Sequence, residues 1–525
     1  MPANCINNCT ITLVVSILLV ILISCNNIQK NQSHQSTSNE SILAGKKLAA
    51  NYCQTCHELP DPSLLDASTW EEKVLPAMGP GLGIFYHRLS RYPSNINDPY
   101  LAKGYYPSKP VITAEQWQEI IDYYSATSPD TLVHSSTTRN INKSLPFFNI
   151  EIPSIKYNNP ATGLVKIDTS SFSKSIIVSD LLSQKLFFFN SKLQLTDSLH
   201  TTGPIVNMDI QQDKILLCNI GFLNPTNNVL GRAQILTKDE KDHFKIDTSP
   251  IIKDLPRPVQ ITSADLNNDG ITDYLTCGFG YLTGEFCWME GQKSGPLIKH
   301  VLNPLPGAIK AYIDDYNHDG LPDIWVLMAH AEEGIFLYTN KGNGKFEQQE
   351  LLRFPPVYGS CYFELDDFNK DGKPDILYTC GDNGDYSPVL KPYHGVYIFL
   401  NDGNNHFKQE YFFALNGCYK AIAEDYDNDG DLDIAAISFF ADYKSTPEEG
   451  FVYLQNNKDL HFEPYTLATL TFGRWLTMDA GDFDGDGKID LILGNCSYGP
   501  SVNKSATDWK KGPPFVILKN ITQNK

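Results

Sequence analysis

The residues with the clearest capacity for chemistry are Cys53, Cys56 and His57, which form a C-x-x-C-H sequence. Two thiols at this spacing can each form a thioether with a vinyl group of haem, and the adjacent imidazole then reaches the iron from one side. The sequence therefore predicts a covalently attached haem, with His57 as its proximal iron ligand.

The second axial ligand of this haem is expected among the residues that follow. Met78 is the only methionine between residues 41 and 127, and a thioether opposite histidine raises the haem potential relative to two imidazoles. The interval from His57 to Met78 is short, so His87 and an open coordination site are the alternatives. We expect Met78, which would make the haem a one-electron relay.

Helical patterns lie on both sides of the motif. Residues 41–52 have helical spacing around Gly45, a small residue that would allow a second helix to approach closely. Residues 113–125 begin with Thr113 and Gln116, which have the spacing of a capping box. The sequence therefore predicts a first and a last helix around the haem motif.

A third helix is expected over residues 69–75, with Ser68 and Glu71 as its capping box. With the C-x-x-C-H motif and its flanking helices, residues 41–127 resemble the cytochrome c family. This resemblance implies a small all-α domain whose terminal helices cross, with haem c as its cofactor.

Five later segments share one acidic pattern, with Asp at position 1, Asp or Asn at 3, Asp at 5, Gly at 6 and Asp at 9. Side-chain oxygens at alternate positions and the carbonyl at position 7 would form the hard oxygen cage that Ca²⁺ prefers. The predicted ligands are Asp265, Asn267, Asp269, Asp273, Asp315, Asn317, Asp319, Asp323, Asp367, Asn369, Asp371, Asp375, Asp425, Asp427, Asp429, Asp433, Asp482, Asp484, Asp486 and Asp490. The alternative is a set of acidic turns that hold no metal.

The acidic loops recur within a longer unit. Their first aspartates are 50, 52, 58 and 57 residues apart, and each unit contains four short strand patterns, which is typical of a propeller blade. An EF-hand would instead carry its last acid at position 12, between helices. The units, such as 334–340 after the loop at 315–323, resemble FG-GAP/VCBS repeats, a calcium-loop propeller family.

Two earlier units, around residues 166–168 and 207–209, keep the strand rhythm without the later acids. We interpret them as metal-free blades, which gives seven blades in all. The last blade lacks a fourth strand, and residues 147–152 resemble the fourth strands of other blades. We expect this segment to complete the last blade and to cover its open edge.

The first 25 residues carry a targeting pattern. Residues 11–24 form a 14-residue apolar run, shorter than the about 20 residues that a spanning helix needs. The run ends at Cys25 in a sequence that resembles the lipobox of bacterial lipoproteins, although a basic N-terminal region is missing. The resemblance implies a lipid on Cys25, and an uncleaved membrane anchor is the alternative.

Composition and domain boundaries agree with an exported multidomain protein. The 525 residues carry a net charge of −19, which disfavours binding to nucleic acid. The predicted parts are a signal peptide (1–25), a flexible tether (26–40), the cytochrome c domain (41–127), a polar linker (128–146) and the propeller (147–525). Seven of the twelve cysteines lie in the propeller, where Cys277 and Cys287 could form a disulfide or stay buried as thiols.

Four basic residues lie in the segments just before the acidic loops, which should be the innermost strands of the propeller, around its central channel: Arg257, Lys310, Lys420 and Arg474. They could form a ring at one end of the channel and hold an anionic ligand, or they could pair with loop aspartates.

The function predicted from the sequence is one-electron transfer by an exported, lipid-anchored c-type cytochrome in the cell envelope. The propeller would be the docking module for a redox partner protein, a carbohydrate or an anionic ligand. A haem-linked dehydrogenase, a polysaccharide-active enzyme and an adhesion or glycan-binding lipoprotein are the alternatives. The absence of dinucleotide, nucleophile-elbow and zinc-helix motifs makes a substrate-converting enzyme less favoured than an electron carrier.

Overall fold

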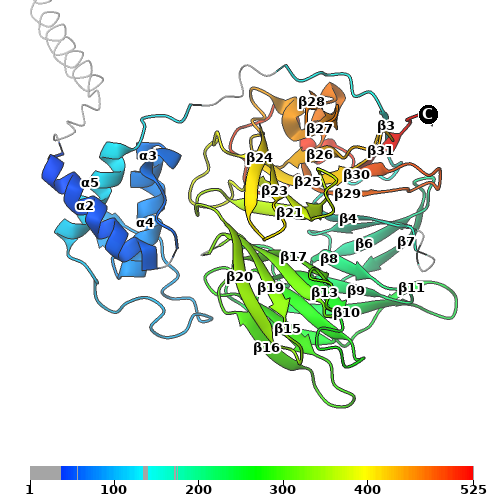
Figure 1. Ribbon diagram of the computed structural model, residues 1–525, viewed down its shortest axis with the longest axis horizontal. Helices are drawn as coiled ribbons and strands as arrows, with labels where there is room; N and C mark the ends of the chain where they lie inside the picture. The colour runs from blue at the N-terminus through cyan, green and yellow to red at the C-terminus, as the bar shows by residue number, and fades with distance from the viewer. Residues whose placement is uncertain are drawn as a thin grey trace, which may run out of the picture.

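The computed structural model describes residues 37–55, 57–133, 140–170, 173, 175–330 and 332–523. A group of helices near the N-terminus lies beside a β-propeller, on its left in Figure 1. The predicted signal peptide, its Cys25 and Cys56, the second cysteine predicted to attach haem, lie outside the described residues. Among the residues that are described, no helix has the length and apolarity needed to cross a membrane.

Two helices of 14 residues each, α2 (Asn39–Tyr52) and α5 (Ala114–Thr127), form the frame of the helical region. Helix α2 begins within the segment predicted as a tether, because the Ser38 side chain accepts a hydrogen bond from the Ser41 backbone N–H and caps the helix. The predicted capping box of α5 is present, since the side chains of Thr113 and Gln116 each bond to the other's backbone N–H.

The two helices cross at Gly45. A Cβ atom on this residue would lie 1.8 Å from the carbonyl oxygen of Glu119 and 2.9 Å from the Cβ of Tyr123, both on α5. Only a residue without a side chain allows this approach, as the sequence pattern around Gly45 predicts.

The third predicted helix begins earlier than expected. A continuous helical segment consists of α3 (Ala67–Thr69), a π-helical turn η3 (Trp70–Val74) and α4 (Leu75–Met78). Asp66, and not Ser68, is the N-cap, because its carboxylate accepts from the Thr69 backbone N–H at 2.9 Å. The remaining short elements are η1 (Cys53–Thr55), η2 (Pro62–Leu64), η4 (Gly79–Leu82), β1 (Tyr86–His87) and β2 (Ser90–Arg91).

The propeller consists of seven antiparallel four-stranded sheets, one for each predicted blade, and the second sheet has an additional strand. Blade 1 contains β4 (Thr162–Asp168), β5 (Ser175–Asp180), β6 (Lys185–Phe189) and β7 (Leu195–His200). Blade 2 contains β8 (Ile205–Ile210), β9 (Ile215–Asn219), β10 (Gly231–Lys238) and β11 (Phe244–Ile246), with β12 (Ile252–Leu255) beside β10. Blade 3 contains β13 (Pro258–Ala264), β14 (Asp273–Gly278), β15 (Glu285–Glu290) and β16 (Ile298–Asn303). In blades 4 and 5 the strands are β17 (Ala308–Asp314), β18 (Asp323–Met328), β19 (Gly334–Asn340), β20 (Phe346–Arg353); and β21 (Ser360–Asp366), β22 (Asp375–Cys380), β23 (Gly395–Asn401), β24 (Phe407–Ala414).

Blade 6 contains β25 (Cys418–Glu424), β26 (Asp433–Ser438), β27 (Phe451–Asn456) and β28 (Phe462–Tyr465). Blade 7 contains β29 (Trp475–Gly481), β30 (Asp490–Asn495), β31 (Phe515–Asn520) and, as its fourth strand, β3 (Phe148–Glu151). The segment expected to complete the last blade therefore pairs with β31, and it joins the two ends of the propeller in one sheet. Three 3-10 turns, η6 (Pro447–Gly450), η7 (Ala468–Phe472) and η8 (Trp509–Lys511), lie in the connections.

Neighbouring blades are joined by polar side chains of their first strands. From blade 2 onward, each first strand carries one side chain that bonds to the backbone of the next blade's first strand, and blade 7 bonds back to blade 1. The six bonds are Asp209 to Ser263, Gln260 to Ala311, Tyr312 to Phe363, Glu364 to Ala423, Lys420 to Met478 and Asp479 to Ile167. Directional bonds therefore supplement the apolar contacts between blades.

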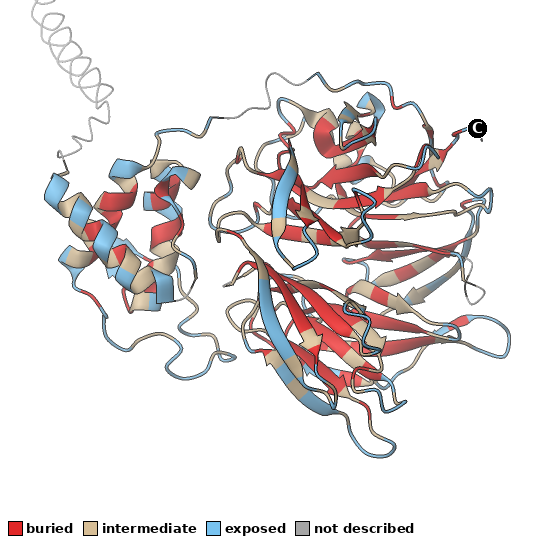
Figure 2. Cartoon of the chain, in the orientation of Figure 1, coloured by how far each residue is buried: buried red, intermediate tan, exposed pale blue. Residues whose placement is uncertain are grey.

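The apolar core of the propeller lies between the blades. Figure 2 shows the middle strands buried and the outermost strands, such as β20 and β24, largely exposed. The seven cysteines of the propeller are buried, and none of them forms a disulfide with another described residue. Cys277 lies opposite Phe286 and Cys287 opposite Thr276, so these two thiols point to different faces of the sheet and form no disulfide.

Part of the predicted linker is attached to the propeller. Asn142 donates its backbone N–H to the Pro464 carbonyl at 3.0 Å, and its own carbonyl accepts from Thr466 at 2.8 Å. The second half of the 128–146 segment therefore lies along the outer strand of blade 6.

Candidate functional site

The haem motif lies where α2 ends. Cys53 is the first residue after α2, and it packs against the apolar core that α2 and α5 enclose, which contains Trp70, Trp117 and Tyr124. The Nδ1 atom of His57 lies 2.7 Å from the carbonyl oxygen of Glu58. Because a carbonyl only accepts hydrogen bonds, Nδ1 carries the proton and the lone pair is on Nε2, the tautomer that can ligate iron through Nε2.

The two candidates for the distal ligand have different surroundings. Met78 is half-buried at the end of α4 and packs against the same core as Cys53. The Nε2 atom of His87 forms a hydrogen bond of 2.8 Å with the Gln118 side chain on α5. The structure thus places Met78 and Cys53 at one core, while the imidazole of His87 is engaged with α5.

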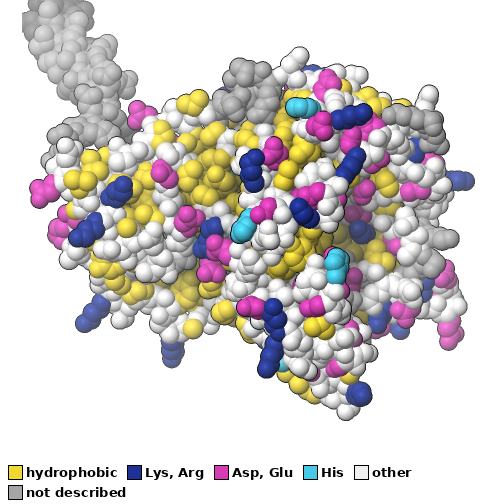
Figure 3. Space-filling model, viewed as in Figure 1, with side chains coloured by type: hydrophobic (Ala, Val, Ile, Leu, Met, Phe, Trp, Pro, Cys, Tyr) yellow, Lys and Arg dark blue, Asp and Glu magenta, His cyan; other side chains and the backbone are white. Residues whose placement is uncertain are grey.

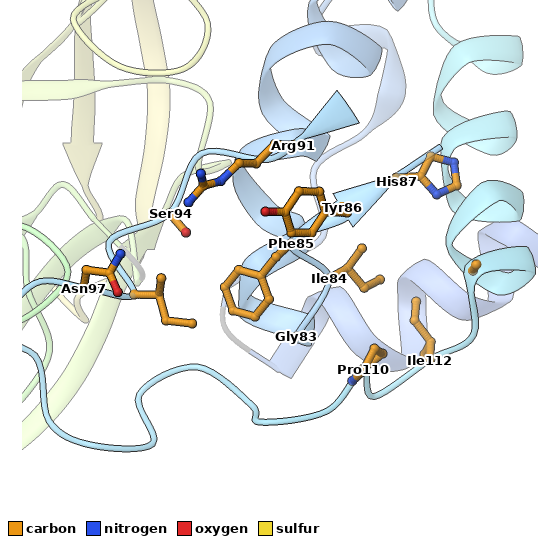
Figure 4. A pocket seen from close by; sticks show the side chains of 12 residues that line it. Gly83, Ile84, Phe85, Tyr86, His87, Arg91, Ser94, Asn97, Pro110 and Ile112 are labelled. Carbon is orange, nitrogen blue, oxygen red and sulfur yellow. The ribbon is translucent and has the colours of Figure 1, made fainter. Parts of the chain in front are cut away.

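A cavity of about 560 Å³ lies beside His87. It is bounded by the short hairpin β1–β2 and by the segment that leads to α5, and Figure 4 shows Phe85 and Tyr86 in its centre with His87 turned towards α5. Its lining contains neither Cys53 nor His57 nor Met78. This cavity is therefore distinct from the region of the haem motif.

Each of the five acidic loops connects the first and second strands of its blade, and in all five the aspartate at position 1 accepts from the backbone N–H groups of positions 5 and 6. In the first loop, the two carboxylate oxygens of Asp265 accept from the backbone N–H groups of Asp269 and Gly270, at 3.0 and 2.8 Å. Gly270 has a φ of +81°, which a residue with a side chain rarely adopts, so the invariant glycine is needed for the turn.

The last aspartate of each loop is the first residue of the second strand and is fully buried in all five blades. In blade 3, Asp273 accepts from the backbone N–H groups of Leu266 and Gly291, at 2.8 and 2.7 Å. Burial raises the pKa of Asp433 in blade 6 and of Asp490 in blade 7 to about 7, and neighbouring loop aspartates contribute to both shifts. Carboxylates this crowded repel one another unless a cation lies between them.

Three carboxylates converge in each of the last two loops. Ligand atoms of Asp425, Asp427 and Asp429 lie within 4.8 Å of one another, and so do those of Asp482, Asp484 and Asp490. The Oδ1 atom of Asp484 is buried without a hydrogen-bond partner, while its other oxygen pairs with the ammonium of Lys519. These oxygen sets have the composition that Ca²⁺ prefers.

An asparagine at the end of the third strand is a functional residue of the loops that the sequence analysis did not interpret. In blade 4, Asn340 donates its backbone N–H to Asp323 at 2.7 Å, and its side chain donates to the Leu266 carbonyl in the preceding blade's loop at 2.8 Å. Asn401, Asn456 and Asn520 make the equivalent backbone bond in blades 5 to 7. The signal was present, because an asparagine recurs at this place in the repeat.

The four basic residues expected to form a ring occupy two different levels of the channel. Arg257 and Arg474 precede their strands and donate to backbone carbonyls, Arg257 to Leu223 at 3.0 Å and Arg474 to Phe439 at 3.0 Å. Lys310 and Lys420 are the third residues of their strands and lie over the Tyr362 ring, at 5.6 and 4.7 Å from its centroid. The ring expectation is therefore wrong, because a shift of three residues along a strand moves a side chain by about 10 Å.

Comparison with known proteins identifies the repeat. The FG-GAP-like repeat matches residues 315–378, 367–436 and 425–493, and each match begins at the first aspartate of an acidic loop. Cartilage acidic protein 1 of Xenopus tropicalis is 28% identical over 187 residues, which cover 33% of this chain and 26% of that protein. The match thus spans about a quarter of that relative.

Solved structures with a similar course of the chain include Saccharomyces cerevisiae Sqt1, with a TM-score of 0.41 and 8% identity, over 73% of this chain and 100% of that one. Another is BBS1N in complex with ARL6DN, with a TM-score of 0.42 and 8% identity, over 73% of this chain and 98% of that one.

Proposed function

We propose that this protein is an exported, lipid-anchored c-type cytochrome that transfers single electrons. Its FG-GAP-like repeats lie in a seven-bladed propeller, a fold that serves as a docking or ligand-binding module. The observation that carries the proposal is the C-x-x-C-H sequence, with Cys53 directly after α2 and α2 crossed by α5 at Gly45. Haem c, when bound, supplies the one-electron redox chemistry.

The residues of the helical region fit a haem. The Nδ1 atom of His57 is directed to the Glu58 carbonyl, which leaves Nε2 for iron. The position of Met78 at the core that Cys53 also contacts supports Met78 as the distal ligand, and the bond between His87 and Gln118 disfavours His87. If His57 and Met78 both held the iron, no site on it would be open to a substrate, which favours electron transfer over substrate conversion.

We further propose that the five acidic loops bind Ca²⁺ and stabilise the propeller. Three carboxylates within 4.8 Å of one another in blades 6 and 7, the unpartnered Oδ1 of Asp484 and the raised pKa of the buried Asp433 and Asp490 support this assignment. The loops fix their own ligands through the backbone bonds to positions 1 and 9, so a cation would find a preformed cage.

We place the protein in the cell envelope, attached to the membrane through a lipid on Cys25. The sequence up to Cys25 and the polar residues that follow it support this location. A redox partner protein would dock on the assembly. The face in Figure 3 shows Lys and Arg interspersed with Asp and Glu, and with the net charge of −19 this pattern disfavours a nucleic-acid partner.

The haem assignment is tested by expression of the full chain together with a haem-ligation system. We expect a c-type absorption spectrum, and a mass increase of one haem on the polypeptide after denaturation. Cys53→Ala should remove one thioether and shift the spectrum, whereas Cys496→Ala, at a buried cysteine of the propeller, should leave it unchanged. A colourless protein would refute the proposed function.

A carrier and an enzyme are distinguished by rapid mixing of the oxidised protein with sugars or alcohols, with and without an added redox protein. Reduction that requires the redox protein is expected. Direct reduction by a sugar or an alcohol would instead favour the haem-linked dehydrogenase.

A further inference from the structure

The face of the propeller opposite the acidic loops carries a second group of chemically active residues. Since strands alternate in direction, the connection between the second and third strands of a blade lies on the face away from the connection between its first and second strands. In blades 4 and 5 these opposite connections are residues 329–333 and 381–394, and both are rich in acidic and basic side chains.

Four of these side chains are removed from solvent although they are polar. Lys391 is 1% exposed, Glu333 2%, Asn383 2% and His394 0%. The Lys391 ammonium donates to the Asn383 side-chain oxygen at 2.8 Å and, among the described residues, forms no ion pair within 4.0 Å. Within the part of the chain that the structure describes, the Nδ2 atom of Asn383 has no hydrogen-bond partner. Buried polar groups are normally satisfied, so the free amide points to a missing partner.

Charged and aromatic groups lie closer to the surface around this buried set. The His330 Nε2 atom is 3.5 Å from a carboxylate oxygen of Asp385, and their side chains are 26% and 55% exposed. The Phe279 ring lies 4.9 Å from the imidazole of His330, and the hydroxyl oxygens of Tyr281 and Tyr386 are 3.4 Å apart. Loops of blades 3, 4 and 5 therefore converge here.

The ionisation of these groups is coupled. Burial raises the pKa of Glu333 to about 7 and lowers that of Lys391 to about 8. Burial and the charge of Asp385 raise the pKa of Asp382. Although burial opposes it, the hydrogen bond from His330 holds the pKa of Asp385 below its usual value. Such perturbed groups gather at ligand-binding and catalytic sites more often than elsewhere.

This group of residues faces the helical region of the same chain. The Tyr393 hydroxyl donates to the Leu64 carbonyl at 3.0 Å, and Val389 packs against the apolar core that also contacts Cys53 and Met78. One connection, 381–394, thus carries Asp382, Asp385 and Lys391 and also touches the proposed haem domain through Val389 and Tyr393. Ligand sites are common at such domain interfaces.

We propose that His330, Asn383, Asp385 and Lys391 form the binding site for a neutral polyhydroxylated compound, a sugar or a polyol, between the propeller and the helical region. This inference rests on the proposed role of the propeller as a docking module. Carboxylates accept from hydroxyl groups, the ammonium and the free amide donate to them, and the rings of Phe279 and Tyr386 offer flat apolar faces.

Two other ligand classes fit less well. The basic groups would attract an anion, but the carboxylates of Asp382 and Asp385 would repel it. A metal ion needs several oxygen or nitrogen ligands close together, and among the described residues three His, Cys, Asp or Glu ligand atoms come within 4.8 Å of one another only in the acidic loops of blades 6 and 7.

The test is a binding measurement on the purified full chain, by calorimetry and thermal shift, with D-glucose, D-xylose and glycerol as neutral probes and D-gluconate as the matched anion. We expect at least one neutral probe to bind and D-gluconate to bind more weakly. Asp385→Asn and His330→Gln should each lower the affinity at least tenfold. The matched control is Asp402→Asn, because Asp402 and His406 form a similar exposed pair at 3.0 Å in another loop.

Four results would overturn the inference: no binding of any neutral probe, tighter binding of D-gluconate, unchanged affinity in both site variants, or an equal loss in Asp402→Asn. Circular dichroism shows whether each variant is folded, and His330→Gln replaces Asp385→Asn if the latter unfolds. The visible spectrum of the same sample separates the two proposals. Haem-loaded protein that binds no probe refutes only this inference, whereas colourless protein that binds glucose refutes only the electron-transfer function.

Discussion

Substitution of Gly45 by alanine tests the helix crossing on which the proposed cytochrome domain depends. The new Cβ would lie 1.8 Å from the carbonyl oxygen of Glu119 and 2.5 Å from its carbonyl carbon. Both contacts are with backbone atoms, so no side-chain rotation relieves them, and the axes of α2 and α5 must separate by more than 1 Å. Overpacking of this kind costs about 1–3 kcal/mol.

An opposing effect reduces this cost. Alanine is the better helix former, by about 1 kcal/mol relative to glycine. Since the overlap is with backbone and is severe, we expect the steric cost to be at the upper end of its range and the net loss of stability of the helical region to be about 2 kcal/mol. Gly81→Ala is the matched control, because a Cβ there would have no atom within 4 Å.

The assay is thermal unfolding of the full chain followed at the haem absorption band, with calorimetry to identify the transition of the propeller. Gly45→Ala should lower the midpoint of the haem-linked transition and leave the propeller transition in place. Gly81→Ala should change neither. A Gly45→Ala protein that unfolds at or above the wild-type midpoint would show that the helices are not in contact at Gly45, and the reasoning would fail.

Three further predictions concern the metal loops, the iron ligand and a buried acid. Chelation of Ca²⁺ by EGTA should lower the melting temperature of the propeller, and excess Ca²⁺ should restore it. The loss of stability should be about 3 kcal/mol for each site that was held at a Ca²⁺ concentration a hundred times its Kd. An unchanged melting temperature would make the loops ordinary turns. Met78→Ala should alter the visible spectrum of the reduced protein and lower its midpoint potential, whereas His87→Ala should leave both unchanged; the reverse result would assign the iron ligand to His87. The pKa of Glu333 is about 7 in the folded chain, against 4.5 for an ordinary glutamate. Between these two pH values the native state therefore binds more protons than the unfolded state. The stability of the fold should fall by up to about 3 kcal/mol as the pH rises from about 4.5 to about 7. Glu333→Gln, which can still accept from Ser360, should lack this loss in pH-dependent melting curves, and an identical pH dependence in both proteins would refute the assignment.

Local and repeated patterns were the parts of the structure that could be predicted from the sequence. The capping box of Thr113 and Gln116 involves four consecutive residues, and the acidic loops repeat at nearly constant intervals, so neither depends on distant contacts. The cap at Asp66 was missed because Asp66 and Ser68 both have suitable side chains, and only the packed helix decides between them.

Features that depend on relative position in space could not be predicted. Arg257 lies just before the first strand of blade 3, whereas Lys310 is the third residue of the first strand of blade 4, so the two differ by three residues in register. His330 and Asp385 pair although they lie in connections of two different blades. The two residues are more than 50 positions apart in the sequence, and their connections share no sequence pattern. Only the closed ring of blades brings such residues together.

The sheet shared by β3 and β31 has a consequence for how the chain reaches its native state. One strand of this sheet lies near the start of the propeller sequence and the other near its end, so the ring cannot be sealed until β31 has been synthesised. Contacts between residues so far apart in the sequence are slow to form. A propeller closed by such contacts therefore takes longer to fold than a domain stabilised mainly by local contacts. For a chain exported as proposed above, that delay would keep the propeller open while it passes through a secretion channel.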